Sequence, residues 1–170
     1  MSDNLEIYGS KTLRKISVEV NNFDKELVDF GKELSDLMYE NDGIGLAAPQ
    51  IGKLIRVVAV DVPNTEKESV VLVNPKIIWA SPEFKNDSEG CLSIPDIRAN
   101  VERPASISVS AFSTTGEQIL FEKITGIFAR AIQHEIDHLN GILFVDKIDP
   151  LKKTLISGKL KKIAKEYKSK

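Results

Sequence analysis

The sequence has 170 residues, of which 28% are charged and 42% hydrophobic, with a formal net charge of −2. This composition is typical of one ordinary globular domain, and it gives no overall sign of DNA or membrane binding. No apolar run approaches the roughly 20 residues of a membrane helix, and the first residues lack the features of a signal peptide. One cysteine cannot form an internal disulfide. We therefore expect residues 1–170 to be a single domain in a reducing cytoplasm.

The first predicted element is a helix that begins at Asp24, a favourable N-cap, and continues to about Tyr39. Its apolar residues recur at the spacing of one helical face: Leu27, Phe30, Leu34, Leu37 and Met38. Small residues then gather between Gly43 and Gly52, where alternate glycines let the main chain approach a ligand or another main chain. Gln50 offers an amide there that can donate two hydrogen bonds. Such a segment is more often a plain turn than a binding wall.

Several short apolar runs follow, and each of them predicts a strand. The runs lie at residues 55–60, 70–73, 76–79, 106–112 and 119–124. The polar segment 63–68 is predicted to be a hairpin loop, and the polar segment 82–88 a second loop. Between the second loop and the fourth strand lies Cys91, flanked by Gly90 and Leu92. A lone cysteine in such a setting is more often a small buried hydrophobe than a metal ligand.

Both histidines of the chain lie one helical turn apart, in the segment from Gln133 to His138. Imidazoles at positions i and i+4 point the same way on a helix, so His134 and His138 could bind one metal ion, with Glu135 close to that face. Around them Ile127, Phe128, Ala131, Ile132, Ile136 and Leu139 leave almost no polar side, which predicts a buried helix from Gly126 to about Asn140. Buried imidazoles and carboxylates require partners, and a metal ion would supply one.

A catalytic metal site of this kind normally has a third protein ligand. Phe144 stands where the elongated metalloprotease pattern has a third histidine, and the only downstream glutamate is Glu166, in a lysine-rich segment. Cys91 is the natural upstream candidate, because a thiolate beside two imidazoles suits iron(II), zinc, cobalt or nickel. Asp137 points away from the metal face, so we predict that it pairs with a buried arginine, Arg103 or Arg130.

The order of these elements predicts an α+β fold, in which antiparallel sheets pack around the central helix that carries HExxH, with one more helix near each end. The helix near the C-terminus is predicted at about residues 150–168. Its apolar stripe is Leu151, Leu155, Leu160, Ile163 and Tyr167, and lysines crowd the rest of its surface. A solvated helix docked by its apolar side is the simpler interpretation, and a basic face for RNA is the alternative.

Three of these segments together resemble the motifs of the peptide deformylase family, in order and at fitting spacing. They are Gly43-Ile44-Gly45-Leu46-Ala47-Ala48-Pro49-Gln50, Glu89-Gly90-Cys91-Leu92-Ser93 and Gln133-His134-Glu135-Ile136-Asp137-His138-Leu139-Asn140-Gly141. The resemblance covers about residues 5–150. It implies removal of the formyl group from the N-terminal formyl-methionine of nascent bacterial proteins, with release of formate.

The resemblance also implies a role for each candidate residue. Cys91, His134 and His138 would hold one iron(II) ion, with zinc, nickel or cobalt as substitutes, and Glu135 would move the proton of the attacking water. The oxyanion would be held by the Gln50 amide and the Leu92 N–H. Substrate binding would fall to Ile44 and Gly45 through their main chain. Glu89 either orients His134 or lines the methionine pocket, and Ile132 is a candidate pocket wall.

Two rival functions remain open at this point. An HExxH metallopeptidase shares the central motif but has a different third ligand. A non-catalytic relative would bind nascent chains or ribosomes through the basic C-terminal helix. The partners implied by the resemblance are formyl-methionyl nascent peptides and, through that helix, the ribosome, with no membrane or DNA partner.

Overall fold

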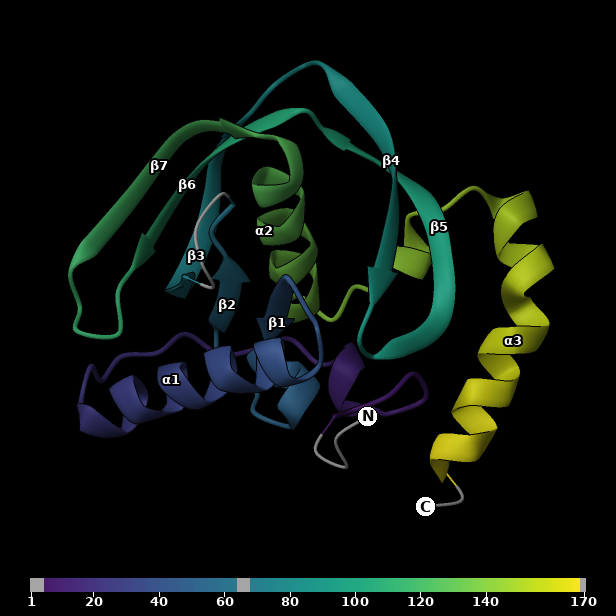
Figure 1. Cartoon of the computed structure of the whole chain (residues 1–170), viewed down its shortest axis with the longest axis horizontal. Helices are drawn as coiled ribbons and strands as arrows, with labels where there is room; N and C mark the ends of the chain where they lie inside the picture. The colour runs from purple at the N-terminus through teal and green to yellow at the C-terminus, as the bar shows by residue number, and fades with distance from the viewer. Residues whose placement is uncertain (1–4, 64–67, 169–170) are drawn as a thin grey trace.

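A computed structural model describes residues 5–63 and 68–168, in which three α-helices and seven strands are arranged as Figure 1 shows. The helices are α1 (Lys25–Glu40), α2 (Gly126–Leu139) and α3 (Pro150–Lys168). The strands are β1 (Gly45–Ala47), β2 (Val57–Asp61), β3 (Ser69–Ala80), β4 (Phe84–Cys91), β5 (Ile94–Pro104), β6 (Ser106–Phe112) and β7 (Gln118–Thr125). Short 3-10 turns are η1 (Thr12–Arg14), η2 (Ala48–Ile51) and η3 (Phe144–Asp146). Within the described ranges, no helix is long and apolar enough to cross a membrane.

The strands form two antiparallel sheets. Five strands pair in the order β1-β2-β3-β6-β7, and β4 pairs with β5 alone. Figure 1 shows α2 between the larger sheet and the β4–β5 pair, with α1 below them and α3 standing beside β5. The predicted α+β class with antiparallel sheets is confirmed.

Strand β2 of the large sheet is covered on both faces, which explains its almost wholly apolar run. Val58 and Val60 belong to one buried cluster with Ile132 and Ile136 of α2. Their neighbours Val57 and Ala59 point the other way, into a cluster that includes Leu27, Leu34 and Met38 of α1. Because α1 and α2 pack on opposite faces of β2, the sheet fixes where both helices lie.

The prediction for α1 agrees closely with the structure. The Asp24 side chain accepts a hydrogen bond of 3.0 Å from the backbone N–H of Leu27, as an N-cap does. At the other end, Asp42 has a left-handed backbone, with φ of 55°, and the N–H of Gly43 returns to the carbonyl of Met38. This closed end of the helix turns the chain directly into β1.

The two strands predicted at 70–73 and 76–79 are in fact one strand, β3. The chain crosses Asn74 and Pro75 without leaving the sheet, through an irregularity in the pairing with β6. Asn74 takes a φ of 51°, and its side chain bonds both the N–H and the carbonyl of Val20. An Asn-Pro pair therefore marks a bulge here and not a strand end.

The prediction of a loop at 82–88 was wrong for residues 84–88, which belong to β4, and β5 was not predicted at all. Most side chains of β4 are exposed, so its sequence lacks an apolar face. In β5 the buried side chains are Ile94, Ile97, Val101 and Arg103. The inward arginine breaks the apolar alternation on which strand prediction depends.

The predicted stripe of α3 was only partly correct. Leu160 is buried, and Ile156 and Ile163 pack on the same cluster, but Leu151 and Leu155 are 78% and 83% exposed. The buried line instead runs from Ile156 through Leu160 and Ile163, at helical spacing. Tyr167 continues it by donating a hydrogen bond of 2.5 Å to Glu6.

Candidate metal centre and active site

Three potential metal ligands meet where α2 faces the end of β4. The ligand atoms of Cys91, His134 and His138 all lie within 4.8 Å of one another. The Cys91 Sγ is 3.2 Å from the His138 Nε2. The histidines come together because α2 presents positions i and i+4 on one side. The cysteine joins them at an irregularity between Gly90 and Cys91, where the pairing of β4 with β5 shifts.

This donor set fits a divalent metal ion of the iron, cobalt, nickel or zinc type. One soft thiolate and two imidazoles suit these ions, and three protein ligands leave a coordination position open for water or substrate. Both histidines are buried, and the pair would be costly to bury without a charge or a donor to satisfy it. The residues therefore meet the requirement for a catalytic metal centre.

Glu89 contacts His134 at the Nδ1 atom and fixes the position of its ring. Its carboxylate accepts bonds of 2.6 and 2.9 Å from Arg103 and 2.6 Å from Arg130, and lies 3.0 Å from the His134 Nδ1. Burial alone would raise the pKa of Glu89, but hydrogen bonds from Arg103 and His134 outweigh it and hold the pKa far below its usual value. Such a partner fixes the ring orientation of a ligating histidine and its tautomer.

Arg103 also completes the predicted pairing of Asp137, at 2.7 Å from its carboxylate. Lys147 contacts the same carboxylate at 2.9 Å. The prediction that Asp137 pairs with a buried arginine is confirmed, and of the two candidates the partner is Arg103. The buried cation thus connects β5 to the helix that carries both histidines.

Glu135 lies between the two histidines in sequence but makes no comparable set of bonds. It is buried, and its Oε2 has no hydrogen-bond partner within the described residues. Burial raises the pKa of Glu135 to about 7, against the opposing charges of His134 and Arg103. A carboxyl group with a pKa near neutrality can both take and return a proton.

Gln50 reaches the same place from the glycine-rich segment. Its Oε1 accepts a bond of 2.8 Å from the Ala47 N–H, which turns the Nε2 toward Ser93 Oγ at 3.1 Å and Cys91 Sγ at 3.6 Å. The orientation of the amide is fixed by this acceptor contact. The amide therefore presents hydrogen-bond donors next to the candidate ligands.

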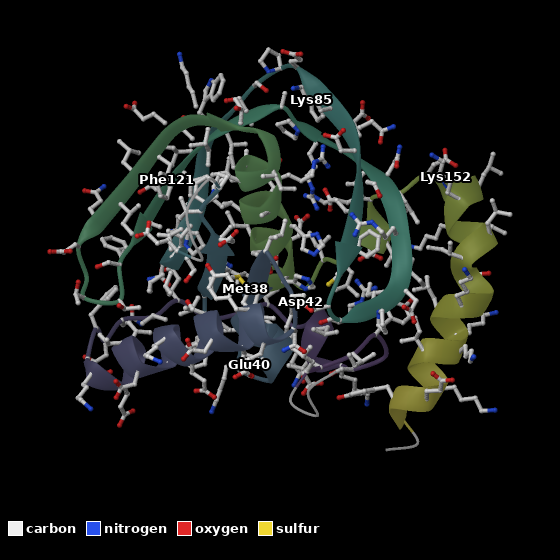
Figure 2. All side chains as sticks on the ribbon, viewed as in Figure 1. Met38, Glu40, Asp42, Lys85, Phe121 and Lys152 are labelled. Atoms are coloured by element: carbon white, nitrogen blue, oxygen red, sulfur yellow. The ribbon has the colours of Figure 1, made fainter. Side chains whose placement is uncertain are left out.

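Gln50, Glu89, Cys91, His134 and Glu135 line one cleft with a volume of about 710 Å³. One side of it is formed by the turn from α1 into β1, including Ile44 and Gly45, and the other by β4 and the first residues of β5. Figure 2 shows Asp42 at the α1 side and Lys85 at the far end of β4. The cleft thus has an edge of the large sheet on one side and the β4–β5 pair on the other.

Comparison with known proteins decides between the open interpretations. The family model for polypeptide deformylase matches residues 3–154. This chain belongs to the polypeptide deformylase family. Its enzymatic class is that of the peptide deformylases, and the metallopeptidase alternative loses its support.

Individual family members are similar over most of their length. Peptide deformylase from Brucella suis is 42% identical over 98% of this chain and 95% of its own. Peptide deformylase 1 from Clostridium acetobutylicum is 48% identical over 83% of this chain and 91% of its own. A solved peptide deformylase structure from Plasmodium falciparum has a TM-score of 0.91 at 37% identity, covering 97% of each chain.

In this member of the family, nine of the ten residues singled out from the sequence line the cleft or lie at the ligand cluster. They are Ile44, Gly45, Gln50, Glu89, Cys91, Leu92, His134, Glu135 and His138. Ile132 does not line the cleft. It is fully buried among side chains of the large sheet, because it lies on the face of α2 that is turned toward β2 and β6. The helix contributes Ile127, Arg130 and Ala131 to the cleft wall in its place.

Sequence reasoning missed two contacts of this deformylase site. Ser93 supports the Gln50 amide, and Arg130 bonds Glu89 directly. The arginine left a signal, since a charged residue inside an otherwise apolar helix requires a buried partner. A serine two residues after a candidate ligand left no such signal.

Proposed function

We propose that this chain is a metal-dependent hydrolase that removes the formyl group from the N-terminal formyl-methionine of newly synthesised proteins and releases formate. The observation that carries the proposal is the cluster of Cys91, His134 and His138 beside a cleft that Cys91, His134, Glu135 and Gln50 line. Family membership supplies the substrate. Residues 1–170 would work as one metallohydrolase domain.

The three clustered side chains would hold one ion per chain, with iron(II) as the native metal and zinc, nickel or cobalt as substitutes. When bound, such an ion acidifies water and polarises a carbonyl oxygen. Glu89 keeps the His134 ring turned so that its Nδ1 stays occupied and its Nε2 remains free to ligate. This geometry favours the positioning role of Glu89 over a direct contact with the methionine side chain.

The remaining residues would act on the substrate itself. Glu135 takes a proton from the attacking water and returns it to the leaving amine. The Gln50 Nε2 and the Leu92 N–H donate hydrogen bonds to the oxyanion as it forms at the formyl carbon. The peptide lies extended along the free edge of β1, where the main chain of Ile44 and Gly45 pairs with it as a strand would.

Replacing Cys91 by alanine tests the ligand assignment. We expect Cys91→Ala to lose both the ion and the formate-releasing activity, because two imidazoles alone hold these ions weakly. Metal per chain, measured by elemental analysis after dialysis, should fall from about one equivalent to well below that value. Ser93→Ala is the matched control and should retain the ion. Stoichiometric metal in Cys91→Ala would show that the cysteine is not a ligand.

A formyl-methionyl peptide with an internal reporter bond also separates the deformylase from a peptidase. Formate should be the only small product, and the peptide chain should stay intact. Cleavage at an internal amide would favour the metallopeptidase.

We further propose a cytoplasmic location, since nascent chains are made there, and ribosome docking through α3. Its exposed lysines include Lys159, Lys161, Lys162 and Lys165, which could meet RNA phosphates. Figure 2 shows Lys152 at the N-terminal end of α3. Replacing Lys159, Lys161, Lys162 and Lys165 by glutamate should weaken co-sedimentation with ribosomes while peptide turnover stays near normal. Unchanged co-sedimentation at low salt would contradict the docking proposal.

A further inference from the structure

β1 passes so close to α2 at Gly45 that a side chain at this position would meet the carboxylate of Glu135. A β-carbon on Gly45 would lie 2.9 Å from the Cδ and 3.0 Å from the Cγ of Glu135, and closer still to its Oε1. Gly45 is not among the glycines with a positive φ, so its backbone conformation suits any residue. The need for glycine at this position is therefore one of space, and the space is filled by one side chain, Glu135.

The main chain at Gly45 has little freedom to move away. β1 pairs with β2, with Gly45 opposite Val60, and the next two residues, Leu46 and Ala47, are fully buried. The Asp61 N–H also donates a bond of 3.0 Å to the carbonyl of Ile44. Any group added at Gly45 would therefore press on the carboxylate of Glu135 before it displaced the strand.

The two buried glutamates of the site are held in different ways. Glu89 is fixed by hydrogen bonds to two arginines and a histidine, whereas the Glu135 Oε2 has no partner within the described residues. A donor on Glu135 would hold it firmly but would occupy a lone pair that the proton transfer needs. Packing against a bare main chain restricts the carboxylate and leaves its oxygens free.

We propose that Gly45 is a positioning residue for Glu135: its missing side chain creates the space in which β1 holds the carboxylate toward the cleft. This role rests on the proposed function of Glu135 as proton carrier. It is additional to any main-chain hydrogen bond from Gly45 to the substrate, which alanine would preserve.

The test is Gly45→Ala in the metal-loaded enzyme. Because a displacement of about 1 Å in a reacting group can cost about 10²-fold, we expect kcat for formyl-peptide hydrolysis to fall by about that factor. KM should change by less than about threefold, since the main-chain contacts remain. Metal per chain, measured by elemental analysis, should stay at about one equivalent.

Gly31→Ala is the matched control. Its β-carbon would meet the Thr114 Cγ2 at 2.8 Å and the Val71 Cγ1 at 3.2 Å, a tight but less severe contact that lies in α1 and outside the cleft. This variant should alter the thermal midpoint without altering kcat.

Two double variants show whether the effect passes through Glu135. In a Glu135→Gln background, Gly45→Ala should cause no further loss of kcat beyond about twofold, because the positioned base is already absent. In a Glu135→Ala background the crowding disappears, so the drop in Tm caused by Gly45→Ala should shrink. This comparison of Tm values tests the proposal even if the Gly45→Ala single variant folds poorly.

Wild-type kcat in Gly45→Ala would overturn the proposal. Three other results would do the same. Gly45→Ala could reduce kcat as much in the Glu135→Gln background as in the wild type, it could lower Tm as much in the Glu135→Ala background as in the wild type, or it could lose the metal ion. Failure of the proposed function is a separate outcome, since it would show as an active Glu135→Gln single variant whatever the behaviour of Gly45→Ala.

Discussion

Glu135→Gln should reduce formyl-peptide turnover by about 10³–10⁴-fold or more, which is the upper part of the range for general acid–base catalysis. The expected effect is this large because, in the proposed mechanism, one carboxylate would serve both halves of the reaction. Glutamine keeps the size of the side chain and removes the basic lone pair. The ion should remain at about one equivalent per chain, since Glu135 is not one of the three clustered ligands.

Gln50→Ala provides the scale for this result. It removes one oxyanion donor, for which a loss of about 10²–10³-fold is typical. Steady-state kinetics with the same formyl peptide and metal should therefore rank Glu135→Gln as the more damaging change. Turnover within about tenfold of wild type in Glu135→Gln would contradict the proton-transfer role.

Arg103→Met should have the largest effect on stability. Arg103 is one of the largest fully buried side chains, and it contacts the carboxylates of Glu89 and Asp137. Removing one partner of a buried charge network leaves the others uncompensated and costs about 3–5 kcal/mol of unfolding free energy. For a chain of this size, that corresponds to a fall in Tm of roughly 6–20 °C.

Acid should reduce the difference between Arg103→Met and wild type. The folded-state pKa of Glu89 lies far below the ordinary value of 4.5, so its contribution is fully present above that pH and is lost as the pH falls below it. Denaturant unfolding at pH 7 and at a series of lower pH values measures both effects. Arg14→Met, which breaks a partly exposed pair with Asp146, is the control and should cost less than about 1 kcal/mol. A Tm for Arg103→Met equal to that of the control would contradict the structural role.

The sequence predicts well those elements whose period or capping chemistry is strong. Asp24 marks the start of α1, and the apolar surroundings of His134 mark α2 as buried. The ligand cluster was predictable for the same reason, because helical spacing places His134 and His138 together and leaves Cys91 as the remaining soft donor.

The predictions of secondary structure were wrong where a residue type can occur in two different structural settings. Pro75 usually ends a strand but here lies inside β3 beside a bulge, and the inward Arg103 hides the alternation of β5. The prediction that Ile132 forms a wall of the pocket was wrong for another reason. Apolar residues all round a helix indicate that it is buried, but they do not show which side of it faces the cleft.

The docking of α3 affects the order in which the protein can mature during its own synthesis. Leu160 belongs to the cluster that also includes Ile94, Ile97 and Val101 of β5, and Cys91 packs against that cluster. A two-stranded pair such as β4–β5 has little stability alone. Because α3 is the last of the described elements in chain order, it leaves the ribosome after all the others. The wall that carries Cys91 is therefore completed only when α3 docks, and we expect a nascent copy to form its full candidate metal site after α3 has emerged.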